Sequence, residues 1–259
     1  MRMSEKIYPI GIQNFEKIRK EGYFYIDKTA LIYRLVKTGS YYFLSRPRRF
    51  GKSLLISTLD AYFRGEKELF KGLAIEKLEK DWVQRPVLHI DLNIGKYDAP
   101  DSLDKILNEA LVKWESVFGT GAGESTLALR FKGVVERAYK QSGQRVAILV
   151  DEYDKPLLQA IGNEELQREY RNTLKPFYGV LKTMDGCIQF AMLTGVTKFG
   201  KVSVFSDLNN LEDLSMWNEY VTLFGFSNQE IHENLEEELH EFAKVQNMTY
   251  DEVNAEIGR

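Results

Sequence analysis

Short apolar runs alternate along this chain with longer stretches of helical periodicity. The runs 41–44, 145–150 and 187–193 are apolar at nearly every position, and 86–90 is similar. A last strand is predicted at 221–226. Strands that are apolar on both faces are typical of a parallel sheet covered by helices on each side. The pattern therefore predicts an α/β fold with a mainly parallel sheet.

Helices are predicted between these strands. The clearest is 102–118, where the apolar side chains form a single stripe. A helix from Glu164 is expected to be interrupted or kinked near Pro176, and a capping box at 227–230 opens another. Further helices are expected at 14–20, 27–36, 54–63, 125–140 and 249–257. The expected organisation is an N-terminal segment (1–40) packed on a three-layer α/β/α core (41–226), followed by a helical region (227–259) that begins a truncated C-terminal part.

The segment 45–53 joins the first apolar run to the helix behind it. Gly51, Lys52 and Ser53 match the end of the phosphate-loop pattern G-x-x-x-x-G-K-[ST], but Arg46 occupies the position of the first glycine. In such a loop the backbone N–H groups face an anion, the lysine reaches the β- and γ-phosphates, and the serine holds Mg²⁺. Strand, loop and helix are the context that the motif requires, so we predict a nucleotide site here.

Positive charge is concentrated in this loop, in Arg46, Arg48, Arg49 and Lys52. Three roles remain open for the arginines: neutralising a triphosphate, binding a nucleic-acid backbone through Arg48 or Arg49, or pairing with a carboxylate such as Asp151. The predicted nucleotide-binding residues are Arg48, Arg49, Phe50, Gly51, Lys52 and Ser53.

The apolar run at 146–150 ends on two carboxylates, Asp151 and Glu152. This matches the second nucleotide motif, often called Walker B. Asp151 is expected to support Mg²⁺ together with Ser53, and Glu152 to polarise a water for attack on the γ-phosphate. An acidic residue at position 152 favours hydrolysis over simple switching.

Thr194 ends the next apolar run. It is either a sensor that hydrogen-bonds the attacking water or the γ-phosphate, or an ordinary strand end. The predicted catalytic residues are Glu152, Lys52 and Thr194. Lys198 and Lys201, just beyond that run, are candidates for a positive charge supplied in cis.

Composition narrows the class of protein. The net charge of −3 gives no global attraction to nucleic acid, so a basic site must be local. The single Cys187 excludes an intramolecular disulfide and suits a reducing cytoplasm. Because no run resembles a signal peptide or reaches membrane-span length, a cytoplasmic protein is expected.

Other candidate chemistry is weak. His89, His232 and His240 have no metal-ligand spacing with one another. The stretch 197–200 lacks the aspartate of a guanine-reading element, which favours ATP over GTP.

Six stretches together resemble the AAA-ATPase-like family of bacterial proteins: 8–13, 22–29, 42–53, 150–156, 193–198 and 205–211. The Arg-Pro-Arg-Arg-Phe-Gly-Lys loop is itself a hallmark of that family. The resemblance implies a P-loop NTPase core of the additional-strand type, with the strand at 187–193 between the loop strand and the Walker B strand. It also implies the phosphate and Mg²⁺ roles given above for Lys52, Ser53 and Asp151, and the role of Glu152 as base.

Family members commonly continue into a PD-(D/E)xK nuclease-like domain, which we expect to be absent here. Tyr25 and Asp27 precede the loop strand and are candidates for lining the adenine pocket. The leading hypothesis is a Mg²⁺-dependent ATPase module that drives or gates an attached effector. The alternative is a catalytically weak, nucleotide-gated scaffold that binds a protein or DNA partner. A kinase ranks behind both.

Overall fold

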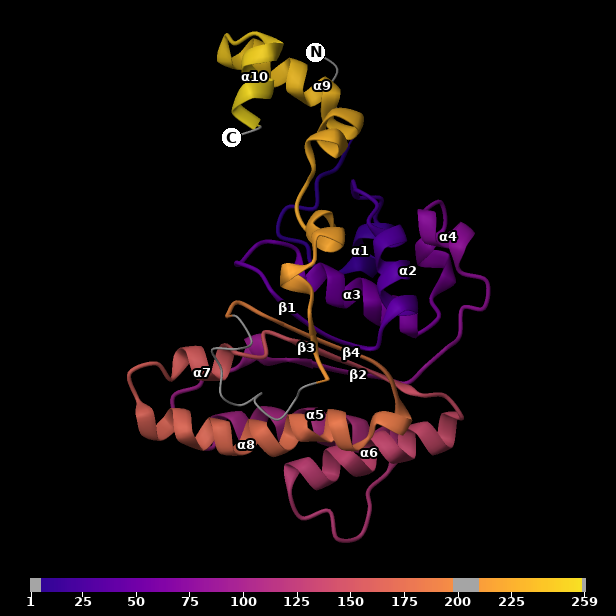
Figure 1. The fold of residues 1–259 in the computed structure, drawn as a ribbon, viewed down its shortest axis with the longest axis vertical. Coiled ribbons are helices and arrows are strands. Elements are labelled where there is room, and N and C mark those ends of the chain that lie inside the picture. The colour runs from indigo at the N-terminus through magenta and orange to yellow at the C-terminus, as the bar shows by residue number, and fades with distance from the viewer. Residues whose placement is uncertain (1–5, 198–209, 258–259) are drawn as a thin grey trace.

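Five strands form one parallel sheet at the centre of the molecule (Figure 1). The structure is a computed structural model that describes residues 6–197 and 210–257. The strands are β1 (Tyr41–Ser45), β2 (Val87–Asp91), β3 (Val146–Asp151), β4 (Ile188–Gly195) and β5 (Glu212–Asp213). Their order across the sheet is β2-β3-β4-β1-β5, and every pair is parallel. β4 lies between β1 and β3, which confirms the predicted additional-strand arrangement.

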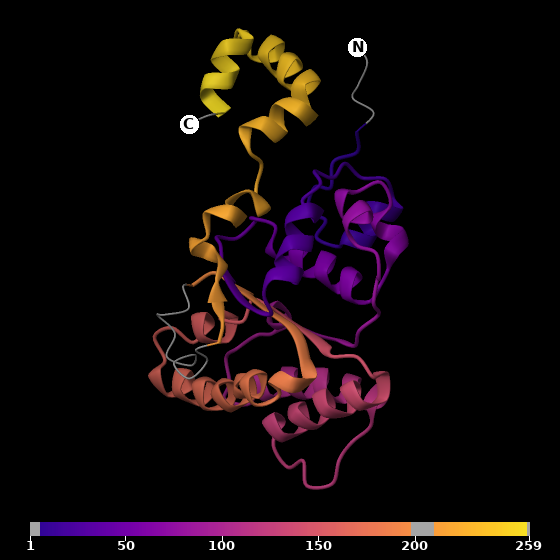
Figure 2. The same ribbon diagram turned by 45° about the vertical axis from the view of Figure 1, so that its right-hand side comes forward.

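Helices cover both faces of the sheet and complete the predicted three-layer sandwich (Figures 1 and 2). The layer below the sheet in Figure 1 contains α5 (Ser102–Phe118), α6 (Leu127–Ser142) and α8 (Glu164–Thr183), with the short α7 (Lys155–Gln159) beside α8. The layer above contains α1 (Phe15–Lys20), α2 (Thr29–Thr38), α3 (Lys52–Phe63) and α4 (Ala74–Leu78). Short 3₁₀ helices are η1 (Lys67–Phe70), η2 (Leu92–Ile94), η3 (Asp185–Cys187), η6 (Leu214–Met216) and η7 (Asn218–Leu223).

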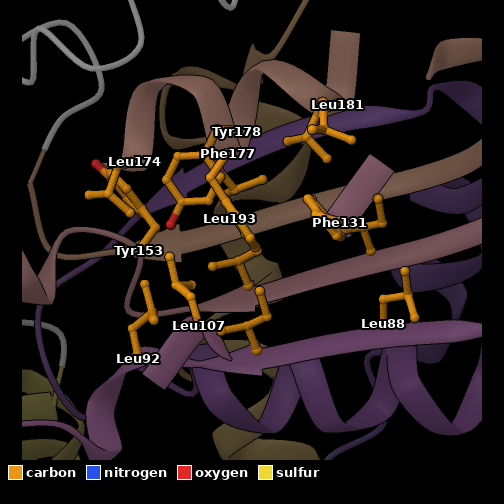
Figure 3. Packing of buried hydrophobic residues seen from close by; sticks show 14 of the residues in the cluster. Leu88, Leu92, Leu107, Phe131, Tyr153, Leu174, Phe177, Tyr178, Leu181 and Leu193 are labelled. Atoms are coloured by element: carbon orange, nitrogen blue, oxygen red, sulfur yellow. The ribbon is translucent and has the colours of Figure 1, made fainter. Parts of the chain in front are cut away.

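The two cores follow from the alternation of side chains along the strands. In β3, Ile148 and Val150 belong to the cluster on the α5–α6–α8 side, whereas Ala147 and Leu149 belong to the cluster on the α1–α4 side. On the first side, Phe131 and Phe177 stack with ring centroids 4.5 Å apart (Figure 3). Every residue of β3 is buried, so this strand and the carboxylates at its end are held firmly in place.

Two predicted features of the helices have different outcomes. α5 occupies 102–118 as predicted from its apolar stripe. The interruption expected near Pro176 does not occur, because α8 continues through Pro176 as one helix. Buried side chains on both sides of the proline, Leu174 and Phe177, fix α8 against the sheet. This packing outweighs the missing N–H of the proline.

The prediction of a strand at 221–226 is wrong. Residues 218–223 form the 3₁₀ helix η7, and the edge of the sheet is occupied by β5, which pairs with Tyr42 and Phe43 of β1. Tyr220 and Leu223, three residues apart, are buried in the same cluster, while Val221 between them is 54% exposed. That spacing suits a helical turn rather than the alternation of a strand.

α9 (Asn228–Gln246) and α10 (Tyr250–Ile257) form an arm that projects from the sandwich (Figure 2). Its small core contains Leu239, Ala243 and Val253. The predicted capping box is confirmed: the Ser227 hydroxyl accepts from the Glu230 N–H, and the Glu230 carboxylate accepts from the Ser227 N–H.

Within the described residues, no helix combines the length and the apolar character that crossing a membrane needs. Lys198 and Lys201, the candidates for a charge in cis, lie outside the described residues.

Candidate nucleotide site

The backbone of the loop explains why the first glycine of the motif is not needed. Two loop residues have left-handed backbone angles, Arg49 (φ 69°) and Gly51 (φ 80°). Arg46 is not among the residues with positive φ, so a side chain at that position creates no backbone strain. The sequence pattern put the special residue at position 46, whereas the structure puts the left-handed conformations at positions 49 and 51.

The side chain of Arg46 points to the segment after β5. Its guanidinium donates to the carbonyl oxygens of Ser45 and Ser215, at 3.2 and 3.3 Å, and lies 5.8 Å from the centroid of the Phe224 ring. Its backbone N–H donates to the Gly195 carbonyl at 3.1 Å. Arg46 therefore fastens the loop to its surroundings. Sequence reasoning missed Ser215 and Phe224 as partners, because a local motif contains no information about residues so far along the chain.

Arg48, Arg49 and Phe50 lie at the exposed tip of the loop, and Phe50 is 46% exposed. Within the ranges that the structure describes, no acidic side chain forms an ion pair with Arg48 or Arg49. Pairing with Asp151 is therefore not their role here. The other two roles, binding a triphosphate and binding a nucleic-acid backbone, remain available to both arginines.

Among the residues that the structure describes, no side chain caps the N-terminus of α3. Gly51 occupies the N-cap position without a side-chain hydrogen bond, and the first turn contains no acidic residue. Side chains of Thr126, Asn163 and Ser227 cap α6, α8 and α9, whereas α2, α4, α5 and α7 resemble α3 in having no side-chain cap. The free N–H groups and the positive end of the dipole make the start of α3 suited to an anion.

Lys52 is buried, with a side chain 4% exposed. Its ammonium lies 3.1 and 3.3 Å from the carbonyl oxygens of Arg46 and Pro47, and 3.2 Å from Glu152 Oε1. The structure thus brings together the two residues to which the sequence assigned phosphate binding and water activation. A buried ammonium needs such partners, since desolvation without them is costly.

Asp151 and Thr194 meet at the ends of neighbouring strands. The Thr194 hydroxyl donates to Asp151 Oδ1, which also accepts the Glu152 N–H at 3.1 Å. Both side chains are almost fully buried, at 4% for Asp151 and 0% for Thr194. In the structure the Thr194 hydroxyl orients Asp151, and its role as a sensor stays a prediction.

A polar pocket of about 400 Å³ adjoins the loop on its Ser53 side. Ser53 and Asp151 both line it, together with Asp60, Asp91 and Asn93, which the motifs did not reveal. A hydroxyl and a carboxylate facing one polar space fit Mg²⁺, which prefers oxygen ligands and keeps several waters or phosphate oxygens. Among the described residues, no group of three or more His, Cys, Asp or Glu side chains is arranged to hold a metal by itself.

An apolar pocket of about 390 Å³ lies on the other side of the loop. Arg49, Phe50 and Gly51 border it, and Tyr25 lines it. Burial is the main cause that raises the pKa of the Tyr25 hydroxyl above its usual value. Asp27 is not among the lining residues; its carboxylate instead accepts hydrogen bonds from Thr29 and from the Ala74 N–H. The remaining lining includes Tyr8, Pro9, Ile18, Phe24, Ile26, Lys28, Ile32, Leu54, Leu55, Thr58, Leu223, Phe224, Gly225, Phe226 and Leu235.

The histidines have structural partners. His89 Nδ1 lies 3.6 Å from Asp60, His232 Nδ1 lies 3.1 Å from the Tyr250 hydroxyl, and His240 stacks on Tyr250. None of these contacts has the form of a metal site.

The strand order, the loop and the acidic residues at the end of β3 define the class: a P-loop NTPase fold. The chain belongs to the family described as Predicted AAA-ATPase, whose model matches residues 9–205. A relative from Azotobacter chroococcum mcd 1, named "Uncharacterized protein in vnfD 5'region", is 43% identical over 231 residues, or 88% of this chain. The chain spans 45% of the length of that relative.

Proposed function

We propose that this protein binds ATP with Mg²⁺ at the 45–53 loop and hydrolyses it to ADP and phosphate. The observation that carries the proposal is the position of Lys52. Its buried ammonium lies 3.2 Å from Glu152 at the uncapped start of α3, so phosphate binding and water activation share one place. Family membership supports nucleotide binding at this fold.

Each residue has a defined part in this proposal. The amides of the loop and the ammonium of Lys52 bind the phosphates, with Arg48 and Arg49 at the rim. Ser53 and Asp151 would hold Mg²⁺, which neutralises charge on the phosphate oxygens. Thr194 orients Asp151. Glu152 accepts a proton as water oxygen bonds to the γ-phosphorus and the bond to the ADP oxygen breaks.

The apolar pocket is the proposed site of the base. It borders the loop and is lined largely by aromatic and aliphatic side chains, which suit a planar adenine. This supports ATP as the nucleotide and gives Tyr25 a part in binding.

The same pocket supports the proposed gating of an effector by nucleotide. Leu235 of α9 lines it, at a point where α9 departs from helical angles (φ −129°). Lys28 forms an ion pair with Glu230 at the start of α9, and Lys6 and Tyr8 both bond Glu238. A base in this pocket would contact the root of the arm, so occupancy can bias the position of α9 and α10. Residues 41–226 would then be the ATPase core that acts on the effector. The single cysteine suits a location in the reducing cytoplasm.

Glu152→Gln separates the two functions left open by the sequence. For an ATPase, the variant keeps ATP affinity within about threefold and loses roughly 10²- to 10⁴-fold in turnover, the usual contribution of a general base. Glu109→Gln, at an exposed carboxylate of α5, is the control. Calorimetry with ATP and Mg²⁺ and a phosphate-release assay measure both. A wild type that binds ATP and releases no more phosphate than Glu152→Gln identifies the alternative, a nucleotide-gated scaffold.

A further inference from the structure

Asp154 is a fully buried carboxylate that no nucleotide motif explains. Its exposed fraction is 0%, and it follows the Asp-Glu pair by two residues. Oδ2 accepts from the Val196 N–H at 3.0 Å, from the Thr197 N–H at 2.6 Å and from the Thr197 hydroxyl. One carboxylate oxygen of the turn after β3 thus holds the chain as it leaves β4.

The second oxygen of Asp154 is in an unfavourable position. Oδ1 is buried and has no hydrogen-bond partner among the described residues. It lies where a Cβ on Gly195 would approach it to 2.7 Å, and the Tyr153 ring would be closer still. Burying a carboxylate oxygen without a partner costs free energy. The protein keeps this carboxylate despite the cost, and Gly195 leaves the space that it needs. Both observations indicate that Asp154 has a role beyond closing a turn.

Tyr153 adds two further bonds between the same segments. Its N–H donates to the Thr194 carbonyl at 2.9 Å, and its hydroxyl donates to the Thr197 carbonyl at 2.8 Å. On the other side of Glu152, Thr194 donates to Asp151. Residues 151, 153 and 154 are therefore each fastened to the end of β4, and Glu152 is the one residue of this turn whose side chain points to Lys52 instead.

Glu152 itself has strained backbone angles. Its φ is 54°, in the left-handed region that non-glycine residues seldom adopt. Such a conformation costs free energy and persists only where neighbouring contacts impose it. The contacts that can impose it include those of Asp151, Tyr153 and Asp154, together with the Lys155 N–H, which donates to the Glu152 carbonyl at 3.0 Å.

We propose that Asp154 is a positioning residue for hydrolysis: by fastening the turn after β3 to Val196 and Thr197, it holds Glu152 left-handed, with its carboxylate at Lys52. This inference rests on the proposed ATPase function. It adds to that function a residue that touches neither nucleotide nor metal and still sets the rate.

The variants are Asp154→Asn, Asp154→Ala and Gly195→Ala. The third would place a methyl group against the Tyr153 ring and Asp154 Oδ1, and so disturb the same contacts from the side of β4. Because general-base catalysis contributes roughly 10²- to 10⁴-fold, partial misplacement of Glu152 is expected to lower kcat about 10- to 100-fold. The dissociation constant for ATP stays within about threefold, since the loop is untouched. Tyr153→Phe, which removes the hydroxyl that bonds Thr197 and leaves Asp154 in place, lowers kcat least and is the variant to use if Asp154→Ala does not fold.

Asp27→Asn is the matched control. Asp27 also accepts bonds from two backbone N–H groups and a threonine hydroxyl, at Thr29 and Ala74, but ties α2 to α4 away from Glu152. It is expected to lower the melting temperature while leaving kcat unchanged when both are assayed well below that temperature. A loss of kcat equal to that of Asp154→Asn would show a general structural effect and overturn the proposal.

A double-mutant cycle tests whether Asp154 acts through Glu152. Added to Glu152→Gln, Asp154→Asn should lower the residual turnover no further. Losses that multiply, or a wild-type kcat in Asp154→Asn alone, overturn the inference while leaving the ATPase function intact.

Hydrogen exchange supplies a readout that needs no turnover. Exchange of the peptide covering 151–154 should be faster in Asp154→Asn and unchanged in Asp27→Asn. If the wild type hydrolyses no ATP, the proposed function fails. The proposal that Asp154 holds the turn at 151–154 then fails only if exchange is also unchanged in Asp154→Asn.

Discussion

Two pockets of nearly equal volume, about 390 and 400 Å³, lie on opposite sides of the phosphate loop and differ in almost every other respect. One is lined largely by aromatic and aliphatic side chains, the other largely by carboxylates, amides and hydroxyls. The apolar pocket is bordered by residues 223–226 and by Leu235 of the arm, and the polar pocket by the ends of β2 and β3. A nucleotide has the same division: an apolar base at one end and a charged, metal-binding triphosphate at the other.

Helix α3 contributes to both pockets from opposite faces. Ser53, Ser57 and Asp60 face the polar pocket, whereas Leu54, Leu55 and Thr58 face the apolar one. Each set follows the three- and four-residue spacing of one helix face. The two faces of α3 therefore separate two chemically different pockets. The comparison predicts that single substitutions should damage one end of the nucleotide and spare the other.

Lys52→Ala should have the largest effect, because Lys52 is the proposed phosphate ligand and its ammonium also contacts Glu152. The variant loses charge-assisted bonds to phosphate, each about 1.5–3 kcal/mol, or roughly 10- to 150-fold in ATP affinity. It also leaves Glu152 without its cation, so turnover falls to background. Calorimetry and phosphate release check this, with Lys105→Ala on the exposed face of α5 as control. Undiminished ATP affinity would contradict the assignment of the loop.

Asp151→Asn should impair Mg²⁺ binding in the polar pocket and leave the apolar pocket unaffected. The expected result is a Mg²⁺ requirement raised about tenfold or more and a reduced kcat, because an amide oxygen is a weaker ligand for a hard cation than a carboxylate. ATP affinity without Mg²⁺ should change little. Turnover measured against Mg²⁺ concentration tests this. Thr194→Val, which removes the hydroxyl that orients Asp151, should shift the same curve less. A Mg²⁺ dependence equal to that of the wild type would exclude Asp151 from the metal site.

Much of the polar side could be predicted from the sequence. Glycine, lysine and serine after one buried strand, and two acidic residues after another, already indicated that Lys52 and Glu152 meet at one edge of a parallel sheet. Strand β4 and helix α5 followed from apolar patterns long enough to be unambiguous.

The missed features depend on side-chain direction and distant partners. Three roles were open for the arginines of the loop, and none of them was a bond from the Arg46 guanidinium to the carbonyl of Ser215, 169 residues further along the chain. The Thr194 hydroxyl donates to Asp151, a partner that the apolar pattern of the strand did not indicate. The segment 221–226 is apolar enough for a strand, but β5 already pairs with β1 at that edge and leaves it a helical turn. Local pattern does not contain such tertiary competition.

Leu54→Ala should weaken binding of the base in the apolar pocket alone, and its effect on ATP affinity should be smaller. Removing the buried part of one leucine from the base pocket costs roughly 1 kcal/mol, or about fivefold in ATP affinity. Affinity for inorganic tripolyphosphate, which has no base, should be unchanged. Competition of both ligands against a fluorescent nucleotide measures the contrast. Equal weakening of both ligands would mean that the pocket does not bind the base.

The smallest effect is expected where the arm meets the apolar pocket. Burial would raise the pKa of Glu230, but hydrogen bonds from Lys28 and Ser227 outweigh it and hold the pKa below its ordinary value of 4.5. A carboxyl with a lowered folded-state pKa stabilises the fold above its unfolded value, and this contribution is lost as pH falls through the folded one. Contact between α9 and Lys28 should therefore weaken progressively below about pH 4.5.

Glu230→Gln should reproduce that weakening at neutral pH. Because a partly buried ion pair contributes about 1 kcal/mol, amide exchange at the start of α9 should rise severalfold, and ATP affinity should fall by roughly twofold. Turnover at saturating ATP should be unchanged, since Glu152, Lys52 and Asp151 are not among the residues that line the apolar pocket. Glu237→Gln, at an exposed carboxylate of the same helix, is the control. Faster exchange in α9 that ATP then suppresses would show that the apolar pocket, unlike the polar one, transmits its occupancy to the arm.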